Sequence, residues 1–124
     1  MEFKEFYISD NNGKSNCVVR SLSKILNKEY NDVYVGLLKV ANDLNASSYN
    51  EIIVFEKYMM DNNIFKIDYP EYMIRDLKLD NGSYIVFGYD KKDYYHMVPI
   101  INNVIYDKNM DCMNLYTISI YKKK

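Results

Sequence analysis

The chain of 124 residues predicts an α+β domain in which helices from the first half pack on an antiparallel sheet from the second half. Two observations lead to this prediction. Apolar residues in the first half recur at the spacing of a helical face, whereas the second half consists of short strand-like runs bounded by turn signals. Helices first and strands second are typical of the α+β class. No Pro-, Gly- or Ser-rich linker divides the chain, so we expect residues 1–124 to form one domain.

Apolar spacing predicts three helices. In the first, valine, leucine and isoleucine side chains recur at i, i+3, i+4 and i+7, which places them on one face. Each of the other two begins after an asparagine, aspartate or serine that can serve as an N-cap. The predicted bounds are residues 16–26, 31 or 32 to 44, and 48 or 50 to about 63.

Turn signals separate the strands of the second half. Asn81 and Gly82 form one such signal, and Asn102 and Asn103 suit a two-residue hairpin because asparagine tolerates positive φ. Pro70 permits a short helix that ends near residue 77. The predicted strands are residues 64–67, 83–88, 94–101, 104–107 and 115–121.

The composition excludes several classes of protein. The 16 basic and 17 acidic residues leave a net charge of −1, whereas nucleic-acid binding needs a clustered basic excess. The one basic run, residues 122–124, is typical of a solvated terminus. One histidine and two cysteines cannot form a four-ligand zinc site or a disulfide framework. With no long apolar stretch and an acidic N-terminus unlike a signal peptide, we expect a cytoplasmic protein without a membrane partner.

Cys17 is the first residue with a chemical signal. It follows a polar Asn-Gly-Lys-Ser-Asn segment and opens the first predicted helix. At a helix N-terminus the unpaired N–H groups and the helix dipole stabilise a thiolate, and they can also hold an oxyanion. The alternative interpretation is a small buried hydrophobic residue beside Val18 and Val19.

His96 and Asp107 form the second signal. Counting outward from the Asn102–Asn103 turn places both side chains on one face of the hairpin as diagonal neighbours, within hydrogen-bonding reach. If the pairing continues, Asn109 lies opposite His96 and is a second candidate for its partner. The alternative interpretation is a structural histidine beside a turn aspartate.

Together these residues match the Cys-His-Asp arrangement of nucleophilic catalysis. Cys17 attacks a carbonyl carbon as the thiolate, His96 holds the ion pair and protonates the leaving group, and Asp107 orients the imidazole. Mononuclear metal binding by the same three residues is a weaker hypothesis, because no close ligand pair such as His-x-x-x-His accompanies them. We predict no cofactor.

The motifs resemble the papain-like cysteine peptidases, and within them compact bacterial and phage relatives of the bacteriocin-leader-processing peptidases. The first matching motif reads Ser15-Asn16-Cys17-Val18-Val19-Arg20-Ser21-Leu22. Tyr30 and Tyr34 match a Tyr-containing segment that opens the second helix of that family, while His96-Met97-Val98 and Tyr106-Asp107 match its histidine strand and the pair after the hairpin. The resemblance implies a papain-like fold, with nucleophile, histidine and acid in that order along the chain.

One position departs from the family pattern. Papain-like enzymes commonly complete the oxyanion hole with a glutamine six residues before the cysteine, and this chain contains no glutamine. The resemblance places Asn11 there, with Asn12 as the nearby alternative.

Other residues have weaker signals. Arg20, one turn after Cys17, favours a structural salt bridge, and Cys112 favours a free thiol without a role. The tyrosines before His96 either pack on the sheet or shape a cleft.

Two functions follow as hypotheses. The first is a small cysteine hydrolase that cleaves a peptide or amide bond through a thioester on Cys17. The second is a catalytically silent papain-like fold that binds or inhibits a protein, as a phage-borne protein would do. Both hypotheses expect a peptide or protein partner, and they leave the oligomeric state open.

Overall fold

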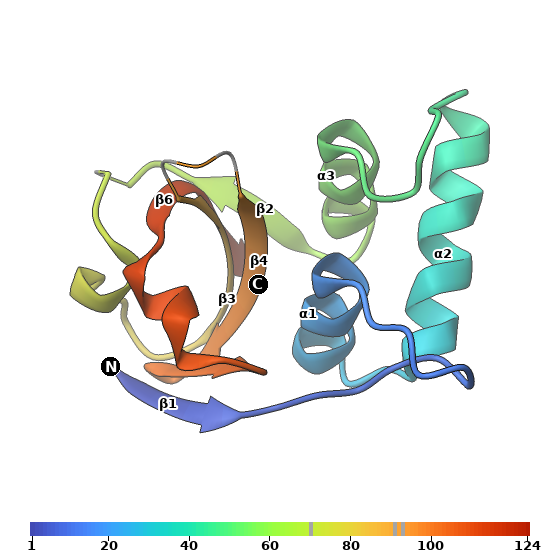
Figure 1. Cartoon of the computed structure of the whole chain (residues 1–124). Helices are drawn as coiled ribbons and strands as arrows, with labels where there is room; N and C mark the ends of the chain where they lie inside the picture. The colour runs from blue at the N-terminus through green and yellow to red at the C-terminus, as the bar shows by residue number, and fades with distance from the viewer. Residues whose placement is uncertain (70, 91, 93) are drawn as a thin grey trace.

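The computed structural model describes residues 1–69, 71–90, 92 and 94–124. Within this part of the chain three helices lie on one side of the molecule and a curved six-stranded sheet on the other (Figure 1). The α+β class is therefore confirmed. The helices are α1 (Cys17–Leu26), α2 (Tyr30–Asp43) and α3 (Ile52–Asp61), and the strands are β1 (Glu2–Glu5), β2 (Ile64–Ile67), β3 (Ser83–Tyr89), β4 (Tyr95–Ile101), β5 (Val104–Asp107) and β6 (Tyr116–Lys123).

The sheet is mixed, which corrects the prediction of an antiparallel sheet. Its strand order is β1-β5-β4-β3-β6-β2, and β1 runs parallel to β5 while the other pairs are antiparallel. The sequence did not indicate β1, because this four-residue edge strand contains one apolar residue, Phe3, and its other three residues are exposed. Pairing with β5 brings the chain that follows β1 beside the end of β5.

The helix starts differ from the predicted ones. Helix α2 begins after Glu29 and α3 after Glu51, so the predicted asparagine, aspartate and serine caps are wrong, and neither N-cap makes a side-chain capping bond. Tertiary contacts explain the earlier start of α2. Tyr30 is buried in the first turn, and its hydroxyl accepts a hydrogen bond of 2.8 Å from the Asn16 backbone N–H.

The predicted strands are confirmed to within two residues at each end, and β2 and β5 match fully. Asn102 and Asn103 adopt φ values of 50° and 63°, which gives the predicted hairpin register with Ile101 opposite Val104. The residues before 77 form only a short 3₁₀ helix, Ile74–Asp76, and the predicted helix start at Pro70 lies outside the described residues. The basic terminus is not a frayed tail, because β6 extends to Lys123 and pairs with β2.

Apolar side chains cover both faces of the sheet. One core lies between the helices and the sheet, and it includes Leu22, Phe55 and Met97. The other core lies on the opposite face, where two short 3₁₀ helices, Ile74–Asp76 and Met110–Asn114, close the curved sheet. Helix α1 lies directly against β4, and the Ser21 hydroxyl donates a 2.9 Å hydrogen bond to the Met97 carbonyl. This contact fixes the beginning of α1 relative to β4.

Candidate active site

Cys17 occupies the first position of α1, as predicted. Asn16 is the N-cap, and its side-chain oxygen accepts a 2.9 Å hydrogen bond from the Val18 N–H. The Cys17 side chain is partly buried. The backbone N–H of Cys17 has no carbonyl in a preceding turn to bond, so it belongs to the unpaired donors of the helix start. The local sequence therefore places a thiol beside free N–H groups.

His96 and Asp107 meet across the β4–β5 hairpin. His96 Nε2 lies 2.7 Å from Asp107 Oδ2, and both residues are less than 10% exposed. The diagonal relation predicted from the hairpin register is confirmed. Asn109 does not take this role, because its side chain caps the 3₁₀ helix Met110–Asn114 by accepting a hydrogen bond from the Asp111 N–H. Asp107 is thus the partner of the imidazole.

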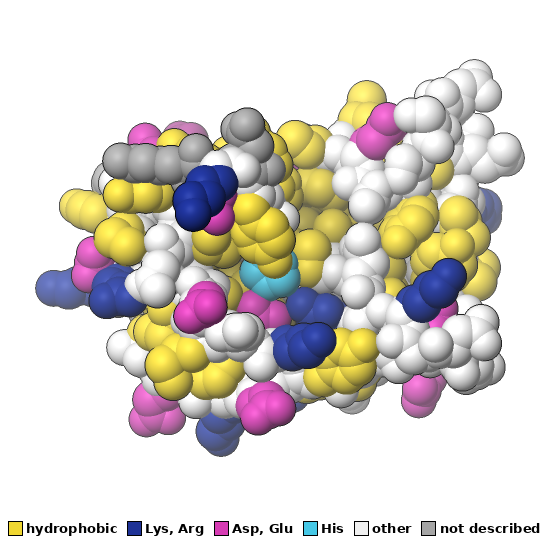
Figure 2. All heavy atoms as spheres, viewed as in Figure 1, with side chains coloured by type: hydrophobic (Ala, Val, Ile, Leu, Met, Phe, Trp, Pro, Cys, Tyr) yellow, Lys and Arg dark blue, Asp and Glu magenta, His cyan; other side chains and the backbone are white. Residues whose placement is uncertain are grey.

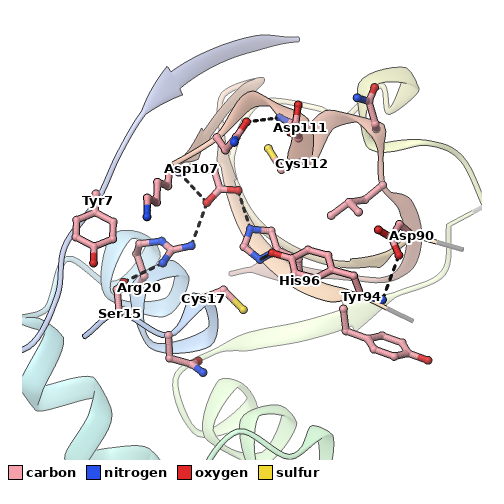
Figure 3. A pocket seen from close by; sticks show the side chains of 16 residues that line it. Tyr7, Ser15, Cys17, Arg20, Asp90, Tyr94, His96, Asp107, Asp111 and Cys112 are labelled. Atoms are coloured by element: carbon pink, nitrogen blue, oxygen red, sulfur yellow. Dashed lines mark hydrogen bonds and ion pairs between the residues drawn. The ribbon is translucent and has the colours of Figure 1, made fainter. Parts of the chain in front are cut away.

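The three predicted residues come together in one pocket, where Cys17 lies beside His96 and His96 bonds Asp107 (Figure 3). Nε2 bonds Asp107, so Nδ1, which the Tyr94 hydroxyl approaches to 3.3 Å, is the ring nitrogen that can exchange a proton with the thiol. Burial by itself raises the pKa of Cys17, but the hydrogen bond and charge of His96, the Met97 backbone N–H and the Arg20 charge outweigh it and lower that pKa. Burial by itself lowers the pKa of His96, but its bonds to Asp107 and Cys17 raise it to about 9. Both shifts act in the direction of a thiolate–imidazolium pair.

Asp107 is held from several sides. Oδ1 accepts a 3.0 Å hydrogen bond from Arg20 and a 2.8 Å hydrogen bond from the Lys108 backbone N–H, while Oδ2 faces His96. Burial alone raises the pKa of Asp107, but His96, the Lys108 N–H and Arg20 together lower it. Burial, followed by the charge of the nearby Asp107, raises the pKa of the buried Cys112 thiol. The two thiols therefore differ in direction, because the surroundings of Cys17 lower its pKa and those of Cys112 raise it.

The three residues face a pocket of about 780 Å³ between the start of α1 and the end of the sheet. In Figure 2 the histidine side chain is visible at the surface, with apolar side chains above it and an acidic and a basic side chain directly below it. Tyr7 lines the pocket from the segment after β1, and Tyr94 and Tyr95 line it beside the start of β4. A substrate that enters the pocket has access to the thiol.

Sequence reasoning understated Tyr94. Its ring stacks on the His96 ring at 5.6 Å between centroids, and its hydroxyl lies 3.3 Å from His96 Nδ1. The phenol ring therefore covers one face of the imidazole, and its hydroxyl lies near Nδ1. The alternation rule already places Tyr94 and His96 on one side of a strand, and the Tyr-Tyr-His sequence was the available signal.

The predicted oxyanion donor, Asn11, lies elsewhere. Asn11 and Asn12 are exposed and line a neighbouring pocket of about 480 Å³ with Tyr30, and neither is among the residues that line the pocket of Cys17. The role of Asn11 in an oxyanion hole stays a prediction. Asn16, which directly precedes Cys17, lines both pockets. The N-cap signal marks this asparagine, but it did not by itself indicate a donor for substrate.

In the part of the chain that the structure describes, no group of three or more histidine, cysteine, aspartate or glutamate side chains is arranged to hold a metal ion. Asp107 has both oxygens engaged by protein donors. Within the same residues, none of the helices combines the length and apolar character needed to cross a membrane.

Comparisons of this chain with protein-family models, with curated proteins and with solved structures give no match. The functional interpretation therefore depends on the geometry of the site.

Proposed function

We propose that this protein is a papain-like cysteine hydrolase that cleaves a peptide or amide bond through a thioester on Cys17. The observation that supports the proposal is that Cys17, at the start of α1, lines the same pocket as His96, whose ring bonds Asp107. A buried structural histidine needs a partner for its ring, but it does not need a thiol at a helix N-terminus on its other nitrogen.

The reaction follows from these positions. The Cys17 thiolate attacks the carbonyl carbon of the substrate. The carbonyl oxygen then takes the negative charge, beside the Cys17 backbone N–H and the Asn16 side-chain amide. When the C–N bond breaks, His96 gives its Nδ1 proton to the leaving nitrogen, which departs as an amine. His96 then takes a proton from water, whose oxygen attacks the thioester carbon; the C–S bond breaks, a carboxylic acid leaves, and the Cys17 thiolate forms again beside the imidazolium. Asp107 stays ionised and keeps the imidazole oriented throughout.

The pH dependence of alkylation tests the activated thiol. Iodoacetamide is added to the folded protein across pH 4 to 10, and mass spectrometry follows Cys17 and Cys112 separately. We expect Cys17 to react with a midpoint well below the usual value of about 8.5, because its pKa is lowered, and Cys112 to react slowly. Equal, slow reaction of both thiols contradicts the proposal and favours the protein-binding module.

A hydrolysis assay tests the reaction. The parent, Cys17→Ala and Cys112→Ala proteins are incubated with a defined peptide library, and new peptide termini are detected by mass spectrometry. We expect cleavage by the parent and by Cys112→Ala, and none by Cys17→Ala. Cleavage that persists in Cys17→Ala rules out a thioester on this residue.

A further inference from the structure

Arg20 lies in the same helical turn as the nucleophile and bonds the acid of the triad. From α1 its guanidinium reaches Asp107 at the end of β5, where NH2 lies 3.0 Å from Oδ1 (Figure 3). The residue is 6% exposed although it carries a charge. A guanidinium this well buried needs a partner, because a charge without one is costly to remove from water.

A second contact orients the guanidinium. NH1 donates a 2.8 Å hydrogen bond to the Ser15 hydroxyl, which in turn donates a 2.6 Å hydrogen bond to the Ile8 carbonyl. The two terminal nitrogens of the Arg20 guanidinium therefore contact different parts of the site. NH2 contacts Asp107 on the sheet, and NH1 contacts the segment that leads into Cys17. Lysine carries the same charge, but its single ammonium lacks this planar fork.

The two carboxylate oxygens of Asp107 have different partners. Arg20 and the Lys108 N–H occupy Oδ1, so Oδ2 is the oxygen that faces His96. Rotation of the carboxylate away from the imidazole would break the Arg20 bond. Charge is balanced as well, since the pair of Arg20 with Asp107 is neutral and so is the pair of Cys17 with His96.

We propose that Arg20 is a positioning residue of the site, which locks Asp107 in the orientation that holds His96 and supplies the positive charge that balances this carboxylate next to the thiolate. The inference rests on the proposed function of Cys17, but it is tested by thiol chemistry that requires no turnover.

The expected effect on pH dependence has a definite sign. The Arg20 charge helps to lower the pKa of Cys17, after burial and the stronger effect of His96. Its loss leaves the field of Asp107 uncompensated, and this negative field disfavours the thiolate and favours the imidazolium. Both the pH at which the thiolate forms and the pH at which His96 loses its proton should therefore rise.

Other groups around the site titrate or carry charge, and they must be the same in the parent and in each variant. The charged side chains that line the pocket from the sheet side are Asp90, Asp107, Lys108 and Asp111. The neutral titratable ones are the phenols Tyr7, Tyr94 and Tyr95 and the Cys112 thiol. Single substitutions at Arg20 keep all of these groups, so a difference from the parent reports the guanidinium.

The experiment compares Arg20→Met, Arg20→Lys and Ser15→Ala with the parent. The matched control is Arg75→Met, which replaces the exposed second arginine of the chain. Circular dichroism first shows that each variant is folded. Iodoacetamide alkylation of Cys17 against pH then gives the thiolate midpoint, and imidazole NMR of the sole histidine gives the His96 midpoint.

For Arg20→Met we expect both midpoints to rise by about one pH unit, which lowers the thiolate fraction about tenfold below the midpoint. Arg20→Lys should retain most of the parental midpoints because it keeps the charge. Ser15→Ala should keep both midpoints but broaden the NMR signals of His96, because the Arg20 guanidinium loses its hydrogen bond to the Ser15 hydroxyl. Arg75→Met should match the parent.

The outcomes separate this inference from the proposed function. A parent whose Cys17 midpoint lies near 8.5 overturns both. A lowered parental midpoint that is unchanged in Arg20→Met overturns the Arg20 role alone. If Arg20→Met does not fold, the folded Arg20→Lys and Ser15→Ala variants decide, and the role is overturned when both give parental midpoints and parental His96 signals.

Discussion

Replacement of Asp107 by asparagine is the most direct test of the buried network. The change preserves side-chain size but removes the charge between Arg20 and His96. An asparagine amide has one accepting oxygen and one donating nitrogen, whereas both neighbours of Asp107 are donors. The nitrogen must therefore face either the guanidinium or the imidazolium, and one buried donor loses its acceptor.

The magnitude follows from the contacts. Asp107 is 3% exposed and accepts hydrogen bonds of 3.0 Å from Arg20 and 2.7 Å from His96. Removal of one partner from a buried ion pair costs about 3–5 kcal/mol. We expect Asp107→Asn to lose about that much of the free energy of unfolding, out of about 5–15 kcal/mol for a typical domain.

Urea unfolding followed by circular dichroism at pH 7 measures this loss. Asp111→Asn is the matched control, because it removes an exposed aspartate four residues away and should change the free energy of unfolding by about 0.5 kcal/mol or less. A loss below about 1 kcal/mol for Asp107→Asn, or one equal to that of Asp111→Asn, refutes the reasoning.

A double-mutant cycle identifies the charge responsible. When Arg20→Met is added to Asp107→Asn, the orphaned guanidinium disappears, so the second substitution should cost less than it does in the parent. We expect a coupling energy of about 2 kcal/mol between the two residues. Free-energy losses that add to within about 0.5 kcal/mol would show that Arg20 and Asp107 do not interact.

Three further predictions concern single residues. The raised pKa of His96 means that imidazole NMR should show it losing its proton as the pH rises through about 9, and a midpoint near 6.5 contradicts the network. Cys112 should resist iodoacetamide at pH 8 until the protein unfolds, because burial raises the pKa of its thiol, and labelling as fast as that of Cys17 contradicts this. Asn103, at φ 63°, should tolerate glycine, whereas valine should destabilise the protein by about 1–3 kcal/mol in urea unfolding, and equal effects contradict the turn assignment.

Local signals in the sequence were sufficient for most elements of the fold. The first helix and the β4–β5 hairpin were predicted because apolar spacing and asparagine turn chemistry act within a few residues. The start of α2 was mispredicted because Tyr30 is held by a contact with Asn16, fourteen residues earlier. Strand β1 was missed because its pairing partner, β5, lies about a hundred residues away and its own side chains carry no alternation.

In the candidate site, too, the residues marked by local signals were predicted correctly. Cys17, His96 and Asp107 were predicted from a helix start and a hairpin register, and the structure brings them together. Asn11 was placed by family resemblance rather than by local chemistry, and it lies in another pocket.

By itself the sequence determined the candidate groups of the site, because it contains one histidine and only one cysteine at a predicted helix N-terminus. The tertiary structure alone decided how those groups are held. The packing of α1 on β4 brings Cys17 to His96, and the same packing carries Arg20 to Asp107, 87 residues away. Such contacts depend on how buried surfaces of distant segments fit together, and no spacing along the chain encodes them.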